Sequence, residues 1–274
     1  MAVEAQNVDL GQIKARQQQT WASGNYAAVG ARIQPMAELL VDAADVPAGS
    51  RVLDVATGSG NAAIAAARSD CVATGLDYTP GLLEHARARA VAEGFEIDFL
   101  EGDAENLPFA DASFDAVTSV VGVMFATDQA AAASEMLRVC RPGGTVALAN
   151  WTPDGFVGQM LKTIGRHVPP PPVPSPLLWG TQQRLGELLG DGVSDLLVRP
   201  RSFVFRFRSA DEFAGFFRTN YGPVHMAFAR LDEAGQAALE ADLVDLAASH
   251  NRATGSSPSV AIPGEYLEVI ATRR

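Results

Sequence analysis

The feature that most constrains the fold of this chain is the sequence VLDVATGSGN at residues 52–61. An apolar strand ends there in a glycine-rich turn, and the turn opens a helix. Glycines let the backbone approach a ligand, and a helix N-terminus offers free N–H groups to an anion. Many nucleotide-binding folds share this arrangement, and residues 58–63 also fit the relaxed G-x-G-x-x-A dinucleotide fingerprint.

Strand-like and helix-like segments alternate from this turn to about residue 150. Strands are expected at residues 51–55, 71–76, 96–100, 114–121 and 145–150. Helices are expected from residue 61, from Thr79-Pro80 through residue 92, and over 129–140, with a turn at 141–144. This alternation predicts a doubly wound parallel α/β sheet.

The flanking regions have a different pattern. Residues 9–45 read as helical, and helices are also expected at 155–166, at 181–189 and within 210–250. Residues 202–209 alternate, with Phe203, Phe205 and Phe207 on one face, which is typical of a half-buried antiparallel edge strand. A last strand is expected at 265–271. We therefore expect an N-terminal helical cap segment at 1–45, a core at 46–152, a substrate cap with strand six at 153–263, and a final core strand at 264–274.

Acidic residues follow two further strands. Asp77 ends the second strand, where a carboxylate can accept both hydroxyls of a ribose. Thr79-Pro80 is expected to cap the next helix and to leave Asp77 free. Asp103 follows the third strand within Gly102-Asp103-Ala104-Glu105, where it could accept from an adenine amine. The carboxyl ends of parallel strands meet at one sheet edge, so these groups predict a ligand site there.

Together these motifs resemble class I S-adenosylmethionine-dependent methyltransferases, in particular the group that includes the ubiquinone and menaquinone C-methyltransferases. The resemblance spans about residues 20–152. It rests on residues 52–60, Asp77, residues 102–105, Leu107-Pro108-Phe109 with Phe114-Asp115, and residues 138–144. It implies a seven-stranded, mostly parallel, Rossmann-like sheet with a helical cap.

The resemblance also implies a set of roles. Asp54 would support the turn and the methionine amino group, Asp77 would hold the ribose, and Tyr78 would pack on the adenine. The residues expected to bind the cofactor are Tyr26, Asp54, Ala56, Thr57, Gly58, Gly60, Asp77, Tyr78, Gly102, Asp103, Ala104, Val120 and Val121. Met124, Phe125 and Trp151 are expected to contact the substrate. Ala56 departs from the family, which usually has glycine there.

No catalytic constellation stands out. His167, His225 and Tyr221 in the expected cap are acid–base candidates without an assigned role. The four histidines lack metal-site spacing, so no metal is expected. The strand-four motif Ser119-Val120-Val121-Gly122 differs from the Asn/Asp-Pro-Pro-Tyr of enzymes that methylate amino groups of DNA bases or glutamine.

Charge and composition limit the partners and the compartment. The formal net charge is −11, which disfavours nucleic acid and anionic membranes as partners. No apolar run is long enough for a membrane span, and residues 1–4 do not resemble a signal peptide. Two cysteines cannot build a disulfide framework, which fits a reducing cytoplasm. The many alanines, and basic residues that are nearly all arginine, suggest a bacterial source. The oligomeric state, monomer or homodimer, stays open.

The function expected from the sequence is methyl transfer from S-adenosylmethionine to a small hydrophobic or aromatic metabolite, with S-adenosylhomocysteine as the product. O- or C-methylation is favoured over N-methylation. One alternative is a protein of this fold with a non-methylating role, such as a cyclase or a binding protein. Another is a nicotinamide-dependent oxidoreductase, against which Asp54, Asp103 and the lack of a Tyr-x-x-x-Lys pair argue.

Overall fold

The computed structural model describes residues 9–274 and places seven strands in one sheet, in the order β3-β2-β1-β4-β5-β7-β6. β1 to β5 are parallel, and β7 pairs antiparallel with both β5 and β6. The strands are β1 (Arg51–Val55), β2 (Val72–Asp77), β3 (Asp98–Glu101), β4 (Phe114–Val120), β5 (Cys140–Trp151), β6 (Val193–Phe207) and β7 (Val260–Arg273). The predicted seven-stranded, mostly parallel α/β sheet is confirmed.

Helices connect and cover these strands. They are α1 (Leu10–Ala22), α2 (Tyr26–Ala44), α3 (Asn61–Arg68), α4 (Pro80–Glu93), α5 (Gln129–Val139), α6 (Phe156–His167), α7 (Gln182–Leu189), α8 (Ala210–Asn220), α9 (Gly222–Arg230) and α10 (Glu233–Ser249). Short 3-10 turns are η1 (Val123–Phe125), η2 (Pro176–Gly180) and η3 (Gly190–Gly192). No helix within residues 9–274 has both the length and the apolar character needed to cross a bilayer.

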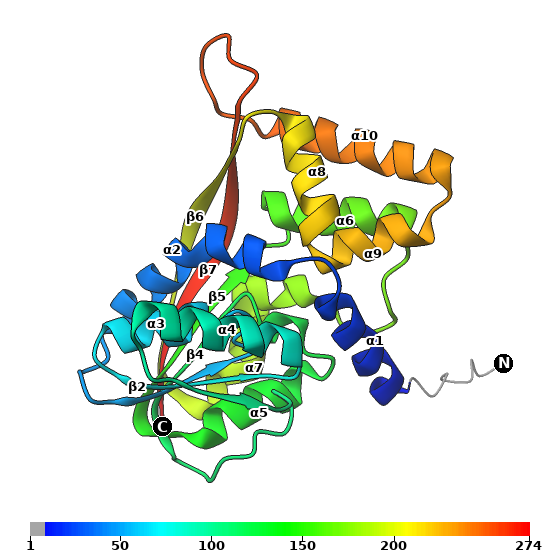
Figure 1. Ribbon diagram of the computed structural model, residues 1–274. Coiled ribbons are helices and arrows are strands. Elements are labelled where there is room, and N and C mark those ends of the chain that lie inside the picture. The colour runs from blue at the N-terminus through cyan, green and yellow to red at the C-terminus, as the bar shows by residue number, and fades with distance from the viewer. Residues whose placement is uncertain (1–8) are drawn as a thin grey trace, which may run out of the picture.

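Two helical layers enclose the parallel part of the sheet. α2, α3 and α4 cover one face, and α5 covers the other with α7 packed beside it (Figure 1). α3 is rich in buried alanines, including Ala62 and Ala65. These small side chains let α3 lie against β1, β2 and α2 at close range. The glycine-rich turn that precedes α3 is therefore held between the sheet and α2.

The remaining helices form a second body beside the long strands β6 and β7. α6, α8, α9 and α10 contact one another and lie beyond the parallel strands (Figure 1). An aromatic cluster joins β6 to α8, with ring centroids 5.5 Å apart for Phe207–Phe213 and 5.9 Å for Phe205–Phe217. We call these four helices the cap. α7 and η2 also lie within the range 153–263 that was expected to form the cap. They pack on the core, where α7 contacts α5 and η2 contacts β5.

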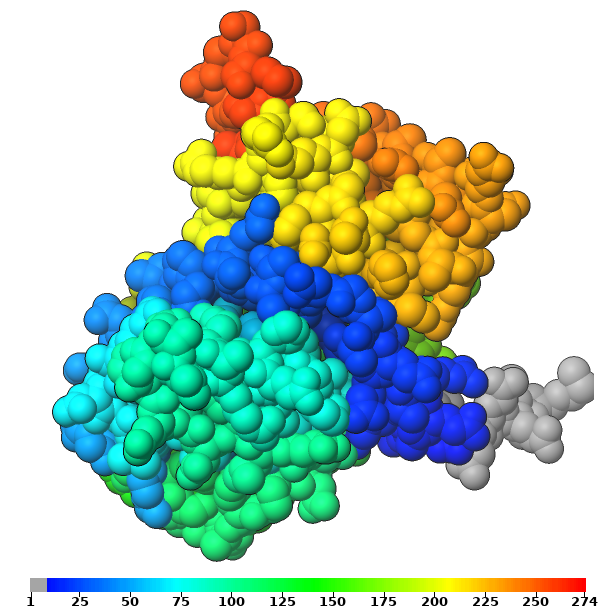
Figure 2. Space-filling view, viewed as in Figure 1, coloured from blue at the N-terminus to red at the C-terminus, as the bar shows by residue number. Residues whose placement is uncertain are grey.

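The α1–α2 segment crosses the junction between the core and the cap (Figure 2). Two glycines allow the close approach at the cap. A Cβ on Gly24, whose φ is +71°, would lie 2.9 Å from the carbonyl oxygen of Asn220. A Cβ on Gly222 would lie 2.1 Å from the carbonyl oxygen of Thr20. The backbone of the α1–α2 turn is thus packed directly on the α8–α9 turn.

Several element boundaries differ from the expectations. The helical region 9–45 is broken at residues 23–25, where Ser23 is extended. The expected turn at 141–144 lies inside β5 as a bulge, because Cys140 pairs with Phe114 and Thr145 with Ala116. β6 begins at Val193 instead of residue 202, and β7 begins at Val260. Residues 1–8, which begin the expected cap segment at 1–45 and on which the expectation of no signal peptide depends, lie outside the described residues.

Candidate active site

A pocket of about 670 Å³, measured out to its mouth, lies at the carboxyl ends of β1 to β4. The strand order reverses between β1 and β4, the position where open α/β sheets bind ligands. The sequence-predicted residues that line it are Tyr26, Ala56, Gly58, Asp77, Tyr78, Gly102, Asp103, Ala104, Val121 and Phe125. The structure therefore brings residues from four strand ends, α2 and η1 to one cavity.

The turn after β1 has an unusual backbone. Ala56, Gly58 and Gly60 all have positive φ, at +54°, +55° and +84°. A left-handed conformation costs an alanine about 1 kcal/mol relative to glycine. The methyl of Ala56 fits because Gly122 lies opposite, where a Cβ would be 2.9 Å from that of Ala56. Gly122 thus makes room for the one residue that departs from the family pattern.

The buried Asp54 carboxylate holds this turn by hydrogen bonds to the turn and to the start of α3. It is 2% exposed, and its Oδ2 accepts from the Thr57 hydroxyl at 2.6 Å and from the Ala63 N–H at 3.1 Å. Its Oδ1 accepts from the Thr118 hydroxyl at 3.2 Å. Burial raises the pKa of Asp54 to about 6, although these hydrogen bonds partly oppose that rise. Neither Asp54 nor Thr57 lines the pocket, since their side chains face each other beneath it.

Asp77 faces the pocket but is not free. Its Oδ2 accepts from the Gly58 N–H at 2.9 Å, and its Oδ1 accepts from the Thr79 N–H at 2.8 Å. The Thr79 side chain makes no capping hydrogen bond, and the Thr79 N–H donates to Asp77 instead. The expectation that Thr79 would cap α4 and leave Asp77 free was therefore wrong. A carboxylate has about four acceptor positions, so two remain for a ligand. Burial raises the pKa of Asp77.

A cluster of charges closes the other end of the pocket. The Nζ of Lys14 in α1 lies 2.5 Å from Asp103 Oδ2 and 2.6 Å from Glu105 Oε2. Glu105 Oε1 accepts from the backbone N–H groups of Thr127 and Asp128 at 2.7 and 3.0 Å. The three charged side chains therefore tie α1 to the loops after β3 and η1.

A second, apolar pocket adjoins the first, with about 350 Å³ of empty space when its opening to solvent is included. Both pockets share Trp21, Tyr26, Val121 and Phe125 as lining residues. The rest of the second lining is Val29, Ile33, Trp151, Val157, Met160, Phe205, Phe217 and Tyr221. No Asp, Glu, Lys, Arg or His belongs to it within the described residues. Burial raises the pKa values of Tyr26 and Tyr221, whose hydroxyls are the titratable groups of this lining.

Other expected site residues line neither pocket. Because side chains alternate along β4, Val120 points to the opposite face from Val121. It packs on Ala37, Val41, Ala62 and Ala65. Met124 is fully buried in the core within η1, so the expected substrate contact of this residue is not supported, whereas its neighbours Val123 and Phe125 line the first pocket. Gly60 supports packing, since a Cβ there would lie 3.1 Å from the Phe99 ring.

The two histidine candidates also lie elsewhere. His167 Nε2 is 2.8 Å from Asp242 Oδ2, and His225 Nδ1 is 3.1 Å from the Arg218 carbonyl oxygen. Of the three acid–base candidates, Tyr221 lines the second pocket, and neither histidine lines either of the two pockets described above. Residues 9–274 contain no group of three His, Cys, Asp or Glu side chains that could hold a metal ion.

The sequence analysis did not identify the contribution of α1. Lys14, Gln17 and Trp21 line the first pocket, and Gln18 Nε2 donates to the Tyr78 carbonyl oxygen. Nothing in the sequence around Lys14 indicates that its side chain reaches a ligand pocket. Only the docking of α1 on the cap and on the β3 loop brings these side chains to the site.

Comparisons with known proteins agree with this geometry. Residues 53–148 match the family model described as a methyltransferase domain. The uncharacterized protein Rv1405c of Mycobacterium tuberculosis is 43% identical over 236 residues, 84% of this chain and 86% of that protein. A demethylmenaquinone methyltransferase of Deinococcus radiodurans is 42% identical over 126 residues, which are 44% of this chain and 52% of that enzyme.

Solved structures share the fold. A putative methyltransferase from Bacillus halodurans superposes with a TM-score of 0.59 at 20% identity, covering 86% of this chain and 97% of that one. The [4+2]-cyclase SpnF gives a TM-score of 0.57 at 22% identity, covering 88% of this chain and 81% of that one. With the strand order, the pocket at the switch point and the family match together, the chain belongs to the class I S-adenosylmethionine-dependent methyltransferases.

Proposed function

We propose that the protein transfers the methyl group of S-adenosylmethionine to an oxygen or carbon atom of a small apolar metabolite that contains a ring. The observation that carries this proposal is the second pocket, which adjoins the first and is lined by aromatic and aliphatic side chains. An amine acceptor would arrive as a cation and would need a carboxylate or a base near it. That lining contains neither, which favours a neutral or self-ionising acceptor.

The first pocket fits the cofactor. The free acceptor positions of Asp77 suit the two ribose hydroxyls, and the turn at residues 56–60 suits the methionine end. Asp103 and Ala104 would meet the adenine edge, with Tyr78 beside the ring. Asp54 would act through the turn it supports, because its carboxylate does not reach the cavity.

The chain would promote the reaction by placement and by exclusion of water. The cofactor supplies an electrophilic methyl group, so the protein mainly has to align an acceptor with it. Tyr26, Trp21, Val121 and Phe125 line both pockets and would surround the point of transfer. A phenol or enol that ionises by itself needs no base from the protein.

The proposal is tested by following labelled methyl groups from S-adenosylmethionine into a panel of apolar phenols, hydroquinones and enols, with primary amines as the contrasting class. Val157→Phe fills the second pocket from a residue that lines only that pocket. It should abolish turnover while S-adenosylhomocysteine binds as in the wild type. Val91→Phe makes the same change on α4 at a side chain that is 77% exposed, and it should leave turnover unchanged.

Transfer to amines, with none to the phenols, hydroquinones or enols, would contradict the proposed acceptor class. Cofactor binding without transfer to any member of the panel would favour a non-methylating role instead. Reduction of a substrate by a nicotinamide cofactor would favour the oxidoreductase alternative.

A further inference from the structure

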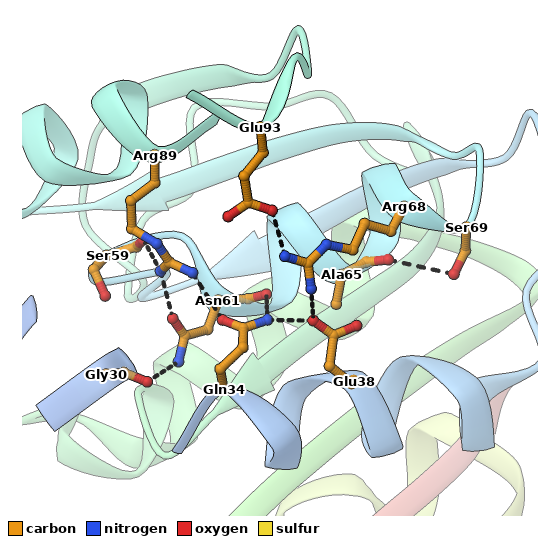
Figure 3. A network of polar contacts seen from close by, with 10 residues as sticks. All are labelled: Gly30, Gln34, Glu38, Ser59, Asn61, Ala65, Arg68, Ser69, Arg89 and Glu93. Carbon is orange, nitrogen blue, oxygen red and sulfur yellow. Dashed lines mark hydrogen bonds and ion pairs between the residues drawn. The ribbon is translucent and has the colours of Figure 1, made fainter. Parts of the chain in front are cut away.

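A network of polar contacts links the end of the glycine-rich turn to α2 and α4 (Figure 3), and none of the residues drawn there lines the first pocket. At its centre, Arg89 of α4 donates from Nη1 to the Ser59 carbonyl oxygen and to Asn61 Oδ1, both at 2.7 Å. Its Nη2 donates to Gln34 Oε1 of α2 at 2.9 Å. Asn61 Nδ2 in turn donates to the Gly30 carbonyl oxygen of α2 at 2.9 Å. One guanidinium thus joins the turn, the start of α3 and α2.

The packing around this network leaves little freedom. Ser59 and Asn61 are 1% and 8% exposed. A Cβ on Gly30 would lie only 2.5 Å from Ser59 Oγ, so α2 rests directly on the turn. Since the Asn61 amide both accepts and donates, its orientation is fixed, and a shift of α2 would break at least one of these bonds.

The same helix carries the aromatic side chain that covers the turn. Tyr26 is the first residue of α2 and lies four positions before Gly30, on the same face of the helix. A Cβ on Gly58 would lie 3.3 Å from the Tyr26 ring. Gly58 and Tyr26 both line the first pocket, whereas Arg89 does not. The register of α2 on the turn therefore sets how closely Tyr26 covers Gly58.

We propose that Arg89 is a positioning residue: with Asn61 it fixes α2 on the glycine-rich turn so that Tyr26 closes over the methionine end of the cofactor. This inference rests on the proposed cofactor site. It predicts that the loss of Arg89 impairs recognition of the amino-acid part of the ligand and spares the adenosine part, which Asp77 and Asp103 would hold.

The chain offers a matched control in the same network. Arg68 of α3 pairs with Glu38 of α2 and Glu93 of α4 (Figure 3). Its side chain is 40% exposed, and it makes no bond to the turn at residues 56–60. Arg68→Ala therefore removes an arginine that links the same three helices and leaves the contacts of Ser59 and Asn61 in place.

The test measures the binding of two ligands by calorimetry. S-Adenosylhomocysteine carries the amino-acid group, and 5′-methylthioadenosine has the same nucleoside without it. Arg89→Ala should weaken binding of S-adenosylhomocysteine by about tenfold or more, since it removes several hydrogen bonds of one charged group. Binding of 5′-methylthioadenosine should stay within about twofold, and Arg68→Ala should leave both affinities within about twofold of the wild type.

Other results of these titrations would contradict either the role of Arg89 or the cofactor site itself. If Arg89→Ala binds S-adenosylhomocysteine as the wild type does, or loses both ligands in parallel, the positioning role is overturned. If the wild type itself binds neither ligand, the proposed cofactor site fails and this inference fails with it. If Arg89→Ala does not fold, the affinities of Arg89→Lys for the same two ligands are compared. An ammonium cannot reproduce the guanidinium fork, so this variant should also bind S-adenosylhomocysteine more weakly and 5′-methylthioadenosine as the wild type does.

Discussion

Replacement of Asp54 by asparagine should stabilise the folded protein at neutral pH. The carboxyl is 2% exposed, and burial raises its pKa from 3.8 to about 6. The folded state therefore holds this proton more tightly than the unfolded chain does. Since one pKa unit corresponds to about 1.4 kcal/mol, keeping the charge above pH 7 costs the folded state about 3 kcal/mol.

The raised pKa of Asp54 determines how the stability of the protein changes with pH. The contribution of Asp54 to the free energy of unfolding falls as the pH rises from about 4 to about 6 and is then constant. The asparagine does not titrate, and its amide can still accept from Thr57 and Ala63 and donate to the Thr118 hydroxyl. The advantage of Asp54→Asn should therefore be small near pH 4 and reach up to about 3 kcal/mol above pH 7.

Urea unfolding, followed by tryptophan fluorescence between about pH 5 and pH 8, measures this difference. Asp115→Asn is the control, because a hydrogen bond from Arg141 and one from the Arg51 N–H hold the pKa of Asp115 below its usual value. That variant should instead lower the free energy of unfolding at neutral pH. An Asp54→Asn protein that is less stable at pH 7.5, or whose advantage does not change with pH, would show that the buried Asp54 charge does not destabilise the folded state.

Three further predictions concern the cap and the acceptor. Gly222→Ala should cost about 1–3 kcal/mol of stability by urea unfolding, because its Cβ would lie 2.1 Å from the Thr20 carbonyl oxygen; Gly215→Ala, which meets nothing within 4 Å, should cost nothing. His167→Ala and His225→Ala should each keep kcat within about twofold, since neither side chain lines either of the two pockets of the site. A loss of about 100-fold would assign an acid–base role. The pH at half-maximal kcat should follow the pKa of the acceptor when two phenols of different acidity are compared; one shared midpoint would indicate a base on the protein.

The sequence predicts the parallel core well because local signals and topology agree there. The strand and turn at residues 52–61 carry apolar, glycine and helix-start signals in one short segment. The switch point of the sheet then brings Asp77 and Asp103 to the same edge. For these residues, knowledge of the fold is enough to place the side chain.

Other parts of the site depend on contacts between segments that are distant in sequence. Val120 is one residue from Val121, yet strand alternation turns it toward α2 and α3. Met124 lies between two lining residues, and the η1 turn points it into the core. Lys14 reaches Asp103 only because α1 docks across the pocket. Such placements follow from tertiary packing, which a local pattern does not encode.

The most direct test of the cofactor site is a calorimetric titration of the wild type and of Asp77→Asn with S-adenosylhomocysteine and with NADH. The asparagine keeps one carbonyl oxygen but replaces the other oxygen with a donor amide. That amide opposes the N–H of Gly58 or of Thr79, and it leaves fewer acceptor positions for the ribose hydroxyls. We expect micromolar binding of S-adenosylhomocysteine by the wild type, binding at least about tenfold weaker in the variant, and no comparable binding of NADH. Tighter binding of NADH, or equal affinity of both proteins for S-adenosylhomocysteine, would contradict the assignment of this pocket.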